Sequence, residues 1–253
     1  MSRARDPYQR ILDLIAAQPG TARAEPGDVV DRLQRLCGAA VVGLSASGAG
    51  ITVLAEDGKH GIFAASDEDC ERLEELQFVL GEGPCIDALR DRRPVLVSHL
   101  DDEAAARWPA YAAEVHAGGV RAVFAFPLQV GAAQLGVLDV FRARPGPLST
   151  TELTGALLFA DVAVSTLLDG QADAPLGLAA AGLVDQVAHR AELFQAQGMV
   201  MVQLGVGLAE ALARIRAYTF AQRRPLHDVA RDIVHRRIRL DRDSPAPDDR
   251  EAP

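Results

Sequence analysis

Several features that would define a function at once are scarce in this sequence of 253 residues. It has three cysteines, Cys37, Cys70 and Cys85, an odd number without CxxC spacing. That count excludes a disulfide framework and is typical of a reduced cytoplasmic protein. No apolar run approaches about 18 residues, so we expect no membrane span. Asp13 interrupts the first apolar run, which argues against a signal peptide.

Catalytic and metal-binding motifs are missing as well, and we therefore expect a protein that is not an enzyme. The segment GLSAS has Ser47 where a nucleophile elbow requires glycine. Gly81 and Gly83 are followed by Ile86 where a dinucleotide-binding loop would have its third glycine. We expect no metal site, since none of three histidines has the spacing of metal ligands: His60, His99 and His116.

Charge is distributed very unevenly along the chain. The net charge is −9, and Lys59 is the only lysine. Between His189 and Arg242, however, ten arginines face five acidic residues, a local net charge of +5. The remainder has 16 basic and 30 acidic residues, a net charge of −14. Such asymmetry suggests a basic module that contacts polyanions, joined to an acidic domain.

The order of apolar patterns predicts an α+β fold with a helical C-terminal end. Helical periodicity is expected at 28–37, 65–80, 84–93, 103–117 and 149–169, with Ser66 as one cap and a Ser149–Glu152 capping box in front of the last helix. Strand patterns occupy 39–46, 50–56, 59–66, 94–100, 119–130 and 132–143. They predict an antiparallel sheet with its helices mostly on one face.

The same patterns suggest five segments. We expect an N-terminal helix and extension, a sheet domain, a linker, a helical domain and a disordered tail, at residues 1–25, 26–169, 170–177, 178–242 and 243–253.

Three helices are expected in the C-terminal segment, over 178–204, 208–222 and from Pro225 onward. The first has a seam with spacings of four, three, four and three, at Val187, Ala191, Phe194, Gly198 and Met201. This seam fits either packing within one bundle or a homodimer. Arginine side chains line the outside of the predicted bundle and suit phosphate binding, although an ordinary solvated helical face has the same composition.

A family resemblance favours phosphate binding over an ordinary solvated face. The segment carries the pattern Ala196-x-Gly198-Met199-x-Met201, Glu210-Ala211, Ile215-Arg216-Ala217 and Leu226-x-x-Val229-Ala230-x-x-Ile233. It resembles the ANTAR domain, the RNA-binding output domain of bacterial antitermination regulators. The resemblance implies binding of RNA stem-loops, which prevents a terminator hairpin from forming, by a dimer.

The resemblance also implies which residues face RNA: Gln197, Arg216, Tyr218, Arg223 and Arg231. Two positions depart from the usual pattern, because Gln197 stands where a lysine is common and Thr219 where an alanine is usual. The loss of that cation could weaken or redirect RNA contact.

Residues 26–169 resemble a GAF domain of the type that precedes ANTAR domains in actinobacterial proteins. The resemblance rests on the segments Gly81-Glu82-Gly83-Pro84-Cys85-x-x-Ala88-Leu89, Arg107-Trp108-Pro109, Gly119-Val120-x-x-x-Phe124-x-x-Pro127-Leu128 and Leu135-Gly136-Val137-Leu138. It implies signal input through a pocket that can hold a small molecule. It does not identify a cofactor, because GAF pockets hold cyclic nucleotides, haem, tetrapyrroles, small metabolites or nothing.

Two other functions remain open at this point. Cys85 lies near the start of a predicted helix, where the dipole favours a thiolate. A GAF-fold thiol-dependent reductase of small sulfoxides could use it, with Cys37 or Cys70 as the resolving thiol. The last two helices could also form a helix-turn-helix of a DNA-binding regulator, although Asp228 and Asp232 suit a major groove poorly.

Overall fold

The computed structural model describes residues 6–20, 27–54, 60–172, 192–193 and 195–240. The chain divides into two compact units, Met1–Gly182 and Leu183–Pro253, and each is treated by itself. The predicted domain boundaries stay predictions, and the predicted tail at 243–253 lies outside the described residues.

The first unit is built on a five-stranded sheet in the order β2-β1-β5-β4-β3. All of its strand pairs are antiparallel. The strands are β1 (Gly48–Leu54), β2 (His60–Ala65), β3 (Val95–Val97), β4 (Ala122–Val130) and β5 (Ala133–Arg142). This confirms the predicted α+β class and the antiparallel sheet.

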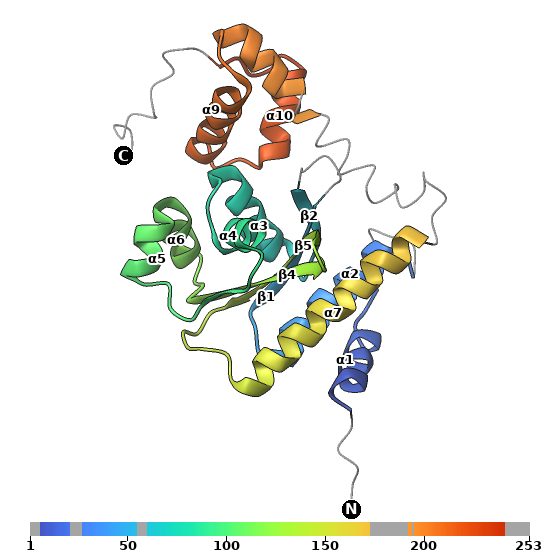
Figure 1. Ribbon diagram of the computed structural model, residues 1–253. Coiled ribbons are helices and arrows are strands. Elements are labelled where there is room, and N and C mark those ends of the chain that lie inside the picture. Colours follow the sequence, from blue (N-terminus) through green and yellow to red (C-terminus); the bar gives the residue numbers. More distant parts are fainter. Residues whose placement is uncertain (1–5, 21–26, 55–59, 173–191, 194, 241–253) are drawn as a thin grey trace, which may run out of the picture. The chain divides into compact units, whose positions relative to one another are not determined.

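Helices cover both faces of this sheet, as Figure 1 shows. One face carries α2 (Val29–Gly43) and α7 (Thr150–Ala172), with α1 (Pro7–Ala16) packed on them. The other face carries α3 (Glu68–Leu80) and α4 (Pro84–Asp91), with α5 (Asp102–Arg107) and α6 (Pro109–Ala117) beside them. The expectation of helices mostly on one face was wrong. Both central strands bury consecutive residues, which is the pattern of a sheet covered twice.

Three local predictions were also wrong. Residues 39–43 continue α2 instead of forming a strand, because Leu33, Leu36 and Ala40 keep the helical spacing on its buried side. Helix α3 is capped by the side chain of Asp67, which accepts from the Cys70 amide, and not by Ser66. The helix expected over 103–117 is divided at Pro109, which begins α6.

The predicted capping box before α7 is present. The Ser149 amide donates to Glu152 at 2.7 Å, and the Glu152 amide donates to Ser149 Oγ at 3.3 Å. Glu152 also pairs with Arg142 at the end of β5. The Ser149 hydrogen bonds and Arg142 together hold the pKa of Glu152 below its ordinary value.

We therefore expect Glu152→Gln to lower stability by about 0.5 kcal/mol near neutral pH, because Gln can still complete the capping box and solvent screens the partly exposed ion pair. A carboxyl whose pKa is lower in the folded state stabilises above its unfolded pKa and loses that contribution as pH falls through the folded pKa. The gap between wild type and variant should therefore close on acidification. Urea unfolding at several pH values between about 7 and 3 measures it. A gap that does not change with pH would contradict the role of the charge.

Helix α7 corrects one premise of the sequence analysis, namely that no apolar run is long enough to cross a membrane. By length and composition, Thr150–Gly170 is apolar enough to cross a membrane, although the apolar runs were judged too short. In the structure α7 packs against α2 and β4 and buries Ala156, Phe159 and Ala163. These contacts are those of a core helix in a folded domain.

The second unit is helical in its described part. Helical residues 195–204 are followed by α9 (Leu208–Ala221) and α10 (Leu226–Val234). Their shared interior is mainly apolar, as predicted for a three-helix bundle, with Gln197 and Thr219 as buried polar residues. Its apolar residues include Ala196, Val200, Leu204, Ala211, Ile215, Val229, Ala230, Ile233 and Leu240. The predicted seam lies partly outside the described residues, at Val187, Ala191 and Phe194.

Candidate functional sites

The loop between α3 and α4 connects these two helices to α6 through hydrogen bonds. Glu82 Oε1 accepts the amides of Ala110 and Tyr111 at 2.8 and 2.9 Å and so caps α6. Gly83 has a φ of 137°, and a Cβ there would lie 2.5 Å from Gln77 Oε1. That same oxygen accepts the Cys85 amide at 2.8 Å. Within the Gly-Glu-Gly-Pro-Cys segment, Glu82 and Gly83 thus each have a structural reason.

We expect Glu82→Ala to lower the free energy of unfolding by about 1–2 kcal/mol, because two helix N–H groups lose their acceptor. Glu82→Gln keeps an acceptor oxygen and should cost clearly less. Chemical denaturation of both variants measures the difference. Equal losses would show that capping is not what Glu82 contributes.

A second polar cluster joins α4 to α5 and α6 through Asp87. This buried carboxylate accepts from Trp108 Nε1 at 3.1 Å and pairs with Arg90 at 2.6 Å and Arg107 at 2.5 Å. The Arg107 guanidinium also lies over the Trp108 ring, 4.6 Å from its centroid. The Arg107-Trp108-Pro109 segment and the loop after α3 are therefore parts of one assembly.

Two solvent-open hollows border this assembly. One of about 280 Å³ lies along β3 and α5, and one of about 180 Å³ lies beside the Gly81–Glu82 turn. Arg107 and Trp108 line both hollows. Each could accept a small polar molecule, but neither is lined by the buried polar groups between the sheet and α3–α4.

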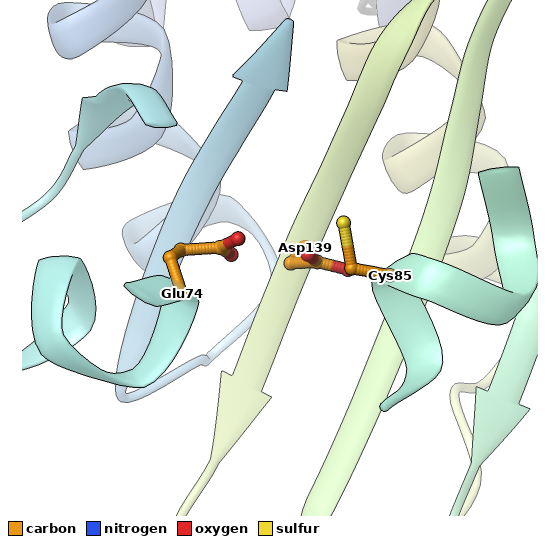
Figure 2. Close-up of side chains that lie close together, drawn as sticks. All are labelled: Glu74, Cys85 and Asp139. Carbon is orange, nitrogen blue, oxygen red and sulfur yellow. The ribbon is translucent and has the colours of Figure 1, made fainter. Parts of the chain in front are cut away.

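Those buried groups form the most unusual site in the first unit. Thr52 Oγ1 donates to Glu74 Oε2 at 3.2 Å, and Gln77 Nε2 donates to Asp139 Oδ2 at 3.3 Å. Thr52, Glu74, Gln77 and Asp139 are fully buried. Figure 2 shows Glu74 approaching from α3 and Cys85 from α4, with Asp139 between them on β5. Two carboxyl groups and a thiol thus meet inside the domain.

Burial dominates the electrostatics of this cluster. It raises the pKa of Asp139 to about 6. Burial and the neighbouring Asp139 carboxylate raise the pKa of Glu74 well above its ordinary value. The same two causes raise the pKa of Tyr111, which lies in the same interior. Two adjacent carboxyl groups in an apolar interior cannot both be ionised cheaply unless a cation lies between them.

The structure corrects the expectation that Cys85 is a favoured thiolate. Its side chain is 0% exposed, and burial together with Asp139 and Glu74 raises the pKa of the thiol. These effects outweigh the helix N-terminus. Cys37 and Cys70 are likewise free and buried, with raised pKa values. Reactive cysteines are accessible and of low pKa, so a thiol-dependent reductase is not favoured.

Sequence reasoning missed Glu74 and Asp139. Asp139 is the single charge in the apolar run from Leu135 to Phe141, which was a readable signal because strand residues buried on both faces are rarely charged. Glu74 does not stand out in the sequence, because α3 contains several other acidic residues. The expectation of no metal site rested on histidine spacing and did not address this cluster.

The five residues predicted to face RNA differ in exposure. Arg223 is exposed, and its φ of 47° places it in a left-handed turn between α9 and α10. Arg216 and Tyr218 on α9 are partly buried, as is Arg231 on α10. Gln197 is only 3% exposed and belongs to the bundle interior. The structure therefore presents four of the five to solvent to some degree.

Ion pairs engage several arginines of this unit. Arg231 lies 3.6 Å from Glu192 and 3.5 Å from Asp228. Asp232 pairs with both Arg224 and Arg237. Arg216 differs from these: its Nε is buried without a hydrogen-bond partner among the described residues, and burial lowers its pKa. Among the predicted RNA-facing residues, Arg216 and Arg223 are thus the arginines for which the described part of the chain shows no ion pair.

These observations first define the class of protein. It has a sheet domain with buried polar groups in its interior, followed by a separate helical unit that carries arginines. The family comparison then identifies the chain. Residues 27–167 match the GAF domain, and residues 181–234 match the ANTAR domain. The chain belongs to the GAF domain family and carries an ANTAR domain after it. This architecture is that of a signal-responsive regulator.

A solved structure supports the fold of the first unit. The GAF domain of a phosphoenolpyruvate-protein phosphotransferase from Acinetobacter is 15% identical, with 68% of this chain and 98% of that chain covered and a TM-score of 0.50. A free methionine-R-sulfoxide reductase from Neisseria meningitidis is 16% identical, with 67% and 91% covered and a TM-score of 0.49. At such identities the likeness concerns the fold alone. No curated protein matches the chain.

Proposed function

We propose that this protein is a cytoplasmic transcription antitermination regulator whose GAF domain receives a signal and whose ANTAR domain binds RNA stem-loops. The observation that carries the proposal is the match of 181–234 to the ANTAR domain on a bundle that presents Arg216 and Arg223. Guanidinium groups suit RNA because they bond two phosphate oxygens at once and stack on unpaired bases.

The proposed RNA face comprises Arg216, Tyr218, Arg223 and Arg231. Tyr218 is partly exposed and could stack on a loop base. Gln197 is left out of this face because its side chain is buried. Where a lysine is usual, this chain has a packed amide, and we infer that its RNA contacts depend on α9 and the turn after it.

Several features support the remaining parts of the proposal. The cysteines are free, which is typical of a reducing compartment. The domain architecture favours a regulator over an enzyme. We propose a homodimer as the active form, in keeping with the family, and a small ligand of the GAF domain as the signal.

The test is binding of the full chain to three labelled nucleic acids: an RNA stem-loop library, unstructured RNA of equal length, and duplex DNA. Each titration is repeated at several salt concentrations. We expect the stem-loops to bind at least about tenfold more tightly than either competitor, with affinity falling steeply with salt. Equal affinity for unstructured RNA would contradict the proposal.

A DNA-binding regulator is the alternative in the same experiment. Against it, the first two turns of α10 carry Asp228 and Asp232, and Asp232 already holds Arg224 and Arg237. Carboxylates on a recognition helix repel the phosphates that flank a major groove. Preferential binding of duplex DNA would establish the alternative.

A further inference from the structure

Three potential metal ligands meet between the sheet and the helices of the GAF domain. A carboxylate oxygen of Glu74, a carboxylate oxygen of Asp139 and the Cys85 sulfur all lie within 4.8 Å of one another. The three side chains are fully buried. They come from α3, β5 and α4, so only the folded chain brings them together (Figure 2).

The cluster contains oxygens that protein groups leave unsatisfied. Glu74 Oε1, Asp139 Oδ1 and Tyr111 Oη are buried without a hydrogen-bond partner among the described residues. Thr52 and Gln77 reach only the other oxygen of each carboxyl. Buried polar atoms are nearly always paired. A proton or a metal ion between the two carboxyl groups would give Glu74 Oε1 and Asp139 Oδ1 the partner that they lack.

The surrounding structure holds the ligands in place. A Cβ at Gly50 would lie 2.7 Å from Glu74 Oε1, so the glycine lets this carboxyl lie against β1. Gln77 contacts both sides of the cluster, since its amide donates to Asp139 and its oxygen accepts the Cys85 amide. Hydrogen bonds of this kind orient metal ligands in known sites.

We propose that Glu74, Cys85 and Asp139 bind a divalent transition-metal ion, with Zn²⁺ as the ion that fits their chemistry. A thiolate disfavours Mg²⁺ and Ca²⁺, while a mixed sulfur and carboxylate set suits Zn²⁺. Three protein ligands leave a fourth position, which a water molecule can fill. Ligand atoms around tetrahedral zinc lie about 3.5 Å apart, from bond lengths of about 2.0–2.3 Å, so movements of about 1 Å complete the site.

The number of groups that take part favours a metal over a proton alone, although both leave a net charge of −1 on the cluster. With Cys85 as thiolate the three ligands carry three negative charges, and no cationic side chain is among the influences on them within the described residues. One shared proton links the two carboxyl groups, and the neighbouring thiol then takes part only through its hydrogen bond with Asp139. A divalent ion uses all three groups, and the thiol proton and the proton held by the carboxyl pair both pass to solvent.

This inference deepens the proposed function, because it names a ligand class for the sensory domain. The ion would link α3, α4 and β5 in addition to the Gln77 hydrogen bonds, and its loss would remove that link. Metal binding is measured without RNA, so failure of the metal site and failure of the RNA-binding proposal give different results.

The experiment loads the metal-free full chain with Zn²⁺ and, separately, with Co²⁺. We expect one bound zinc per chain by elemental analysis after dialysis, a higher melting temperature, and a near-ultraviolet thiolate-to-cobalt absorption. Cys85→Ser and Asp139→Asn should each weaken Zn²⁺ binding by at least about 100-fold. Cys37→Ser, a buried thiol in α2, should retain full binding and serves as the control.

Circular dichroism first establishes that each variant is folded. If Cys85→Ser does not fold, Asp139→Asn and Glu74→Gln, which keep side-chain size, decide the question. Less than about one tenth of an equivalent of metal in the wild type would overturn the proposal in favour of a shared proton. Undiminished binding by the folded ligand variants would also overturn it.

Discussion

Replacing Gly136 by alanine is expected to destabilise the GAF domain by about 3 kcal/mol or more, with loss of the folded state as the extreme. Gly136 lies on β5 opposite Val53 of β1. A Cβ at this position would lie 1.9 Å from the backbone oxygen of Thr52. The obstacle is backbone, so relief requires β1 and β5 to separate. Thr52 also holds Glu74, so the buried cluster would be disturbed as well.

The matched control is the same substitution in α7. A Cβ at Gly155 would lie 3.4 Å from a Leu44 methyl group, which is ordinary contact. Alanine is favoured over glycine in a helix by about 1 kcal/mol. Gly155→Ala should therefore be neutral or stabilising in urea unfolding. If the two variants behave alike, the close β1–β5 approach is not what selects glycine at 136.

The sheet could be predicted from the sequence, because alternation and turns mark antiparallel strands locally. The packing of helices on both faces of the sheet was harder to predict. The β-branched residues Val41 and Val42 favoured a strand where α2 continues, since strand and helix compete in short apolar runs. The runs in β4 and β5 were continuous enough to predict burial on both faces, and that signal was not used.

Replacing both Arg216 and Arg223 by glutamine is expected to weaken stem-loop binding by about 100-fold at moderate salt. Each substitution removes one phosphate-binding cation and keeps the side chain long, so the fold should change little. The dependence of log affinity on log salt should become shallower by about one for each arginine lost. Fluorescence anisotropy at four or more salt concentrations measures both quantities.

The control is a variant of the first unit that also loses two arginine charges. Arg72 and Arg93 are exposed and pair with Asp69 and Asp91 on their own surface. The double change of these residues to glutamine should leave RNA affinity within about threefold of the wild type. An equal loss in both double variants would mean that net charge, and not a defined face, determines binding.

The candidate sites were predictable only in part. Motif order placed Arg216 and Arg223 on the correct helix and turn. It could not show that Gln197 turns inward, because that depends on how 195–204 packs in the bundle. Glu74, Cys85 and Asp139 are far apart in sequence and meet only through the packing of α3 and α4 on β5. Long-range convergence of this kind has no local pattern.

Transcription readthrough tests the central claim most directly. RNA stem-loops selected by the full chain from a random-loop library are placed upstream of an intrinsic terminator, and full-length transcripts are quantified with and without the protein. We predict increased readthrough with the wild-type chain and none with the Arg216→Gln, Arg223→Gln double variant. Tight binding of the selected stem-loops without any change in readthrough would contradict an antitermination function.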